Sequence, residues 1–171
     1  ASSLGDRRWN DRWEDPSLAN AEREFQRGQT VLKRVLAIPR GELSADDRLN
    51  YDLFKYQAEL GLEEYRHRTF LLAISQRGGI QIADELADAL RFETVKDFED
   101  WIARLERFPK LMEHTIALLR QGIRERLVQS KITMQRVPGQ IEKQIVEKAE
   151  ESPFFKPFTG FPAGIGDGDR T

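Results

Sequence analysis

Apolar residues recur every three or four positions along most of this chain, which is the pattern of amphipathic α-helices. The first such stretch follows Asp15 and Pro16, which fit an N-cap and the first helical position. Its apolar positions are Leu18, Ala21, Phe25, Leu32 and Val35. A second stretch begins after Ser44, where Asp47 completes a variant of the capping box, and it reaches about Arg66. Both stretches predict helices.

Two apolar stripes stand out in this pattern. The stripe of the second predicted helix is Leu49, Leu53, Tyr56 and Leu60. The stripe of a helix that starts at Pro109 is Met112, Ile116, Leu119, Ile123 and Leu127. Regular spacings of three and four residues are typical of the buried face of a helix in a bundle. We therefore expect the stripe of the helix that starts at Pro109 to lie in the core.

Shorter helices are predicted between and after these two. Residues 82–90 fit a short helix, and Thr94 with Asp97 resembles a capping box at the start of another. A last helix over residues 132–149 contains Pro138, so it is either kinked there or starts afresh. The sequence thus predicts an all-α fold, a multi-helix bundle-like array.

The domain organisation follows from where this pattern stops. Residues 1–158 are predicted to be one helical domain, and residues 152–158 end the helical region with three Phe and two Pro. Those rings must pack on something, because exposed they would form an adhesive patch. Residues 159–171 are rich in Gly and predict a linker or a truncated loop. A domain followed by such a segment is expected to be a piece of a longer chain.

Composition narrows the class of function. The chain has 171 residues, with 27 Lys and Arg against 29 Asp and Glu, two His and no Cys. A net charge of −2 argues against a nucleic-acid partner, which requires many cationic phosphate contacts. Without Cys there is no disulfide and no thiolate ligand or nucleophile. No apolar run reaches the ~20 residues of a membrane span, so none is expected.

No catalytic or metal-binding motif is found. His67 shares a helix face with Glu63, but two arginines beside it disfavour a cation, and His114 fits an ordinary helix position. The sequence contains no His-Glu-x-x-His, no Gly-x-Ser-x-Gly and no phosphate-binding glycine motif. We therefore assign no catalytic residue, no metal ligand and no cofactor to this chain.

One segment is a candidate for contact with a substrate. Residues 69–81 change from an apolar run to a polar stretch with two adjacent glycines, and irregular or short extended backbone is expected there. Glycines allow close approach of a ligand, and the polar side chains beside them offer directional hydrogen bonds. The candidate cleft residues are Gln76, Arg77, Gly78, Gly79 and Gln81. The alternative is a plain connection between helices.

Four stretches in this order resemble a known family. They are LGDRRWNDR at residues 4–12, LSADDRLNYDL at 43–53, QRGGIQ at 76–81 and ESPFFKPF at 151–158. Together they resemble the N-terminal portion of the bacterial domain-of-unknown-function family 885, and the resemblance extends over essentially the whole chain.

The resemblance implies a longer, mainly helical protein that is exported, periplasmic or lipid-anchored and is similar to the HExxH zinc metallopeptidases. In that family the zinc ligands lie downstream of the matched region, so none is carried over to a residue here. The chain would then be the helical amino-terminal part of a zinc-dependent peptidase-like hydrolase. It would help to form the substrate cleft, be inactive alone, and have the remainder of the polypeptide and a peptide substrate as partners.

A stand-alone helical module that binds a protein or peptide is the alternative function. Its groove would be lined by Phe154, Phe155 and Phe158, or by Trp9 and Trp13. The two tryptophans have a purely structural interpretation as well, in which they cover the helical bundle.

Overall fold

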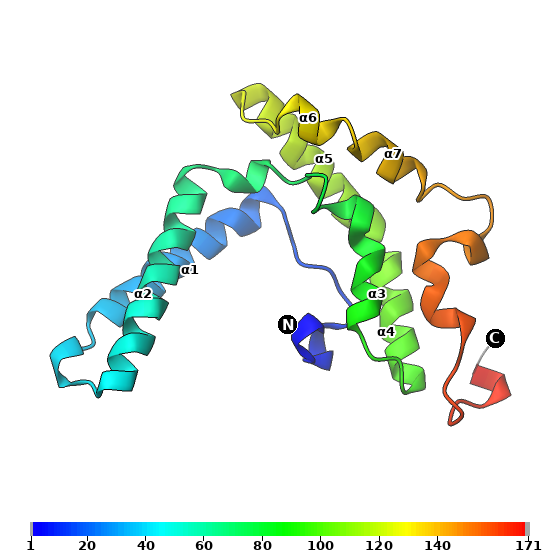
Figure 1. The fold of residues 1–171 in the computed structure, drawn as a ribbon, viewed down its shortest axis with the longest axis horizontal. Helices are drawn as coiled ribbons and strands as arrows, with labels where there is room; N and C mark the ends of the chain where they lie inside the picture. The colour runs from blue at the N-terminus through cyan, green and yellow to red at the C-terminus, as the bar shows by residue number, and fades with distance from the viewer. Residues whose placement is uncertain (1, 170–171) are drawn as a thin grey trace.

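The computed structural model describes residues 2–169, and helices dominate them (Figure 1). The α-helices are α1 (Leu18–Leu36), α2 (Ala45–Arg66), α3 (Leu86–Ala89), α4 (Val95–Glu106), α5 (Phe108–Glu125), α6 (Lys131–Met134) and α7 (Val137–Glu142). Eight short 3-10 helices, η1 to η8, lie between and around them. Within these residues the sole β-type pairing is one antiparallel bridge between Ser75 and Gly78. The predicted all-α helical array is confirmed.

The molecule has an arm and a body (Figure 1). α1 and α2 pack on each other as an antiparallel hairpin, and this arm projects at an angle from the other helices. In the body α4 packs on α5, and η5 (Ile80–Glu85) contacts α3, α5 and α7. The 3-10 helix η4 (Thr69–Leu71) contacts both α2 and α5. It therefore joins the arm to the body.

The helix starts are close to those predicted. Ser44 caps α2 as expected, since its hydroxyl accepts a hydrogen bond from the Asp47 amide at 3.1 Å. α1 starts two residues later than predicted, because Ser17 rather than Asp15 is its cap. The Ser17 hydroxyl accepts from the Asn20 amide at 3.2 Å, and the Asp15 carboxylate accepts from the Ser17 amide at 2.9 Å. The predicted cap therefore holds the actual cap in place.

The predicted helix over residues 132–149 is wrong in its extent. The structure divides it into α6 and α7, and α7 ends at Glu142. Pro138 lies in the first turn of α7, where its missing N–H is not needed. Residues 153–159, which include the Phe-Pro segment predicted to end the helical region, form the 3-10 helix η7 (Pro153–Thr159). Residues 69–81 are irregular, as predicted, with a tight turn between η4 and η5.

The core of the body is aromatic. Trp101 of α4 is fully buried, and its indole N–H donates to the carbonyl oxygen of Phe154 at 3.1 Å. Phe154 also packs on Phe108, with ring centroids 5.1 Å apart, and Phe158 packs on Phe98 at 5.8 Å. Phe154 and Phe158 thus pack on α4 and α5, while Phe155 packs on Phe158.

The prediction that the apolar stripe of α5 lies in the core is wrong, and the apolar stripe of α2 is exposed as well. The α2 residues Leu49, Leu53, Tyr56 and Leu60 are 45–63% exposed, and Ile123 of α5 is 67% exposed. α2 packs on α1 through its opposite side, where Leu62 is buried. α5 buries Thr115, Leu118 and Gly122 instead of its stripe. The small residues Thr115 and Gly122 let α5 approach η4 closely. The side of α5 that carries them is therefore buried, although the apolar stripe lies on another side.

Among the residues described, none of the helices combines the length and the apolar character that a bilayer-crossing segment requires.

Candidate functional site

A cavity of about 1120 Å³ lies between α1, the body and the amino-terminal segment, residues 6–17. This volume is of the size that holds small ligands and peptide side chains. We call it the central cavity. Its lining includes Trp9, Arg12, Trp13, Glu14, Asp15, Asn20, Glu24, Arg27, Phe70, Gly79, Ile80, Ile82, Leu86, Arg104, Thr115 and Leu118.

Arg104 of α4 is the most unusual residue of this lining, because its side chain is charged and only 3% exposed. Its guanidinium donates to the carbonyl oxygens of Asn10 at 2.7 Å and Trp9 at 2.6 Å, and to the Ser2 hydroxyl at 3.0 Å. It also lies 5.1 Å from the centre of the Trp13 ring. Burial lowers the pKa of Arg104, although nearby carboxylates oppose this shift. Arg104 therefore fixes the backbone of the amino-terminal segment against α4.

Further contacts hold the amino-terminal segment in place. The Trp13 indole N–H donates to the backbone oxygen of Arg104 at 2.7 Å. The Asp11 carboxylate pairs with Arg12 at 2.7 Å and with Arg107 at 2.9 Å. The hydrogen bond from Arg12, with a second from Arg107, holds the pKa of Asp11 well below its usual range. Two residues of the LGDRRWNDR stretch, Trp9 and Arg12, thus belong to this wall of the cavity.

The charges around the central cavity are mixed. Arg12, Arg27 and Arg104 are balanced by Glu14, Asp15 and Glu24, while side chains such as Phe70, Ile82 and Leu118 supply apolar surface. A lining of this kind suits a chain that presents amide groups together with apolar and charged side chains. A peptide has this chemistry.

Of the five predicted cleft residues, one lies in the lining of this cavity. Gly79 lines it, whereas Gln76, Arg77, Gly78 and Gln81 are outside the lining. Gln81 is 3% exposed, and its amide N–H donates to the carbonyl oxygen of Ser75 at 2.6 Å. The Gln81 side chain therefore closes the turn. The carbonyl oxygen of Gln76 accepts a hydrogen bond from the Gln140 side chain of α7 at 3.1 Å.

Gly79 has a conformation that requires glycine. Its φ is +133°, and an added Cβ would lie 2.6 Å from the Gln81 side-chain oxygen and 3.2 Å from Ile74 Cα. The glycine thus allows η5 to start directly after the turn. η5 then places Ile80 and Ile82 along the cavity.

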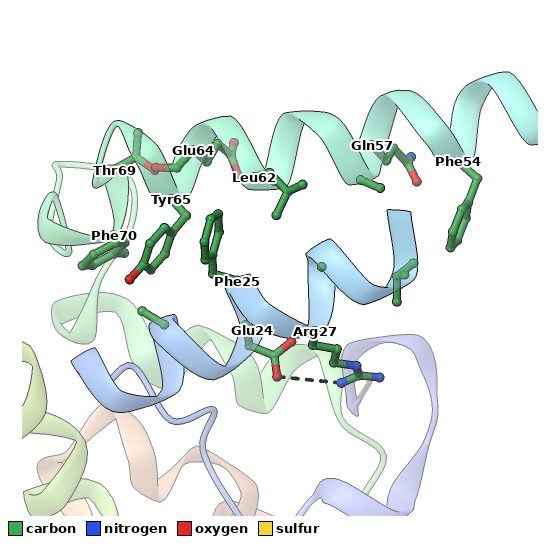
Figure 2. Close-up of a pocket in the computed structure, with 15 residues that line it drawn as sticks. Glu24, Phe25, Arg27, Phe54, Gln57, Leu62, Glu64, Tyr65, Thr69 and Phe70 are labelled. Atoms are coloured by element: carbon green, nitrogen blue, oxygen red, sulfur yellow. Dashed lines mark hydrogen bonds and ion pairs between the residues drawn. The ribbon is translucent and has the colours of Figure 1, made fainter. Parts of the chain in front are cut away.

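A second concavity, which we call the arm groove, lies between α1 and α2 (Figure 2). It measures about 600 Å³, and Figure 2 shows Phe25 of α1 facing Tyr65 of α2. These rings stack with centroids 4.2 Å apart, and Phe70 lies 5.5 Å beyond Tyr65. Gly28 lets Leu62 approach α1, since an added Cβ would lie 3.2 Å from its side chain. The arm groove is mainly apolar.

The two histidines lie in separate places. His67 caps the C-terminus of α2, with its Nε2 3.7 Å from Glu63, and His114 Nδ1 lies 3.4 Å from Asp15. In the part of the chain that the structure describes, no three His, Cys, Asp or Glu side chains come together as metal ligands. These residues do not fit a zinc ion.

Neither Arg104 nor the central cavity was predicted from the sequence. A usable signal was present, because Asp97, Trp101 and Arg104 follow the helical period and share the buried side of α4. Charged residues on a buried face need buried partners, and here the partners come from the amino-terminal segment. The arginine on an apolar face was therefore the best clue to this site.

The fold and the cavity define an all-helical protein with a concavity of about 1120 Å³ between a hairpin arm and an aromatic body. The chain matches the family described as "Bacterial protein of unknown function (DUF885)" over residues 1–170, and it belongs to this family. This match confirms the family resemblance drawn from the four stretches. No curated protein and no solved structure matches the chain significantly.

Proposed function

We propose that this chain is the helical amino-terminal part of a zinc-dependent peptidase-like hydrolase, in which it forms one wall of the substrate cleft and is inactive alone. The central cavity carries the proposal. Its mixed charges and apolar side chains suit a peptide, and Arg104 fixes its wall rigidly. The zinc similarity comes from the family resemblance.

The exposed apolar faces support the part of the proposal that concerns a larger protein. α2 and α5 together leave side chains such as Leu49, Leu53 and Ile123 more than half exposed. Exposed apolar surface of this kind is typical of faces that other protein elements cover. The chain would contribute binding surface, and the residues that hold the metal would come from elsewhere in the polypeptide.

Kinetics of a longer protein containing these residues test the proposal. Ala83 lines the central cavity, and Ala83→Trp would fill part of it. We expect peptide hydrolysis that a zinc chelator abolishes, with KM raised about tenfold by Ala83→Trp and kcat changed less. Ala117→Trp, on the exposed side of α5, is the matched control and should leave KM unchanged.

Circular dichroism and thermal unfolding of both variants establish that they are folded. Absence of hydrolysis across a peptide library would remove the peptidase proposal. Equal KM values for Ala83→Trp and the control would remove the role of the central cavity.

The arm groove favours a second candidate, a stand-alone module that binds a protein or peptide. The stacked Phe25 and Tyr65 offer an aromatic surface for an apolar side chain. The groove that was expected along Phe154, Phe155 and Phe158 does not support this candidate, because these rings pack on α4, on α5 and on each other. A monodisperse chain that binds peptides, with affinity lost in Phe25→Ala, would favour this candidate.

A further inference from the structure

The outer face of α2 is apolar although nothing in residues 2–169 buries it. This face consists of Leu49, Leu53, Tyr56 and Leu60, which are 61, 52, 63 and 45% exposed. Their spacings of four, three and four residues put them in one line along the helix. Such a line is the seam that packs against another helix.

The opposite side of α2 is apolar too. Phe54, Ala58, Leu62 and Tyr65 line the arm groove against α1 (Figure 2). At 3.6 residues per turn these positions lie about half a turn from the outer face. A helix that is apolar on two opposite sides is typical of the middle of a packed layer. α1 packs on one side of α2, and the apolar residues on the other side are suited to contact a second helix.

The borders of the outer face are acidic. On one border Asp46 precedes Leu49 and Glu64 follows Leu60, and on the other border Asp52 and Glu59 lie along the line with Glu63 just beyond it. No Lys or Arg of α2 lies within about 90° of the line of apolar residues. Asp52 pairs with Arg40, and Glu63 pairs with Arg66, whereas Lys55 lies 3.7 Å from Glu59. Three of these five acids thus have a basic partner, and Asp46 and Glu64 leave the borders with a net negative charge, which disfavours contact between two copies of α2.

We propose that the outer face of α2 docks an amphipathic helix with an apolar line bordered by Lys and Arg, supplied by the longer polypeptide. The source of this helix rests on the proposed function, but its chemistry rests on α2 alone. Apolar side chains would fill the seam, and basic borders would meet the acids of α2. The arm would then be fixed between α1 and this helix.

A synthetic helical peptide tests the chemistry on the chain itself. The probe is a fluorescein-labelled peptide with Leu at the same spacing, Lys on both borders and Ala elsewhere. We expect saturable binding by fluorescence anisotropy, weakened about tenfold by Leu53→Glu and by replacing the Lys borders with Glu. Ile132→Glu, at a 76% exposed position of α6, is the matched control and should leave binding unchanged.

Other results would overturn the proposal. Equal affinity for Leu53→Glu and the control, or for peptides with Lys and Glu borders, would exclude this face as the site. Self-association that Leu53→Glu abolishes would identify a second copy as the occupant. In that case the exposed apolar line of α5, which Arg120 and Arg124 border, would be the surface of the second copy that contacts α2. Arg124→Glu would test that contact.

Photo-crosslinking in the longer protein tests the source. Because this chain has no Cys, Tyr56→Cys carries a benzophenone at a defined point, provided other Cys residues of the longer protein are replaced. We expect crosslinks within one polypeptide to a helix with basic borders. Crosslinks only between chains, or none, would overturn the proposal. Neither experiment measures hydrolysis, so docking and the peptidase proposal can fail separately.

Discussion

At the scale of single residues, Arg104 does the most to hold the candidate site together. One buried side chain donates to two carbonyl oxygens of the amino-terminal segment and to the hydroxyl of Ser2. Removing a buried donor leaves such acceptors unpaired. The free-energy cost of an unpaired buried acceptor is larger than the net stabilisation that the hydrogen bond itself contributes. The position of Trp9 and Trp13 along the central cavity therefore depends on a residue of α4.

We expect Arg104→Met to lower the free energy of unfolding by about 2–4 kcal/mol, because three acceptors lose their donor. Arg77→Ala removes an exposed arginine of the turn before η5 and should change it by less than about 0.5 kcal/mol. Urea unfolding followed by tryptophan fluorescence measures both. Equal stability of the two variants would contradict the role given to Arg104.

The ion pairs of Asp11 should make the free energy of unfolding depend on pH in the acidic range. The pKa of Asp11 is depressed in the folded protein by Arg12 and Arg107, so the unfolded chain binds the proton more tightly. The stabilisation is complete above the unfolded pKa of about 3.9 and is lost as pH falls toward the lower folded value.

We therefore expect Asp11→Asn to lower the free energy of unfolding by about 1 kcal/mol at pH 6, since the arginines are half-exposed. The difference from the unmodified chain should shrink toward pH 2. Urea titrations at pH 6, 4 and 2 measure it, and a difference independent of pH would refute the assignment.

At the scale of elements, glycines decide how closely the helices approach. Gly122 lies where α5 meets η4, and an added Cβ would be 2.6 Å from the Leu127 carbonyl oxygen and 3.4 Å from that of Leu71. The local pattern predicted the existence of α2, α4 and α5. Which side of α5 is buried followed from this close contact, which the apolar pattern does not encode.

Gly122→Ala should lower the thermal stability, with a loss of about 1–3 kcal/mol from overpacking. Gly139→Ala is the matched control, because nothing lies within 4 Å of its added Cβ in α7. There Ala should stabilise the chain by about 0.5–1 kcal/mol through helix propensity. Thermal unfolding by circular dichroism gives both signs, and a stabilised Gly122→Ala would contradict the close packing.

At the scale of the whole molecule, apolar surface exceeds what the chain itself buries. The arm meets the body through η4 and the amino-terminal segment, which leaves the outer face of α2 bare. The apolar line of α5 is exposed as well. A molecule with these two exposed apolar faces should bind apolar probes while it is folded.

We expect the folded chain to enhance Nile red fluorescence, and Leu53→Glu with Ile123→Glu to reduce this enhancement by more than half. Both side chains are more than 50% exposed, so the free energy of unfolding should change by less than about 0.5 kcal/mol. Dye titration and urea unfolding measure the two quantities. Unchanged dye binding would place the apolar surface elsewhere.

The sequence by itself determined the long helices α1, α2, α4 and α5, the cap of α2, the irregular segment around residues 69–81 and the family, because periodicity, capping and motif order are local properties. Only the tertiary structure decided which helix faces are buried, where the central cavity lies and which of the candidate residues reach it. The predicted Gln81 supports the turn, Gly79 reaches the cavity, and Arg104 anchors its wall. Those outcomes depend on contacts between residues some 90 positions apart, and no local pattern contains them.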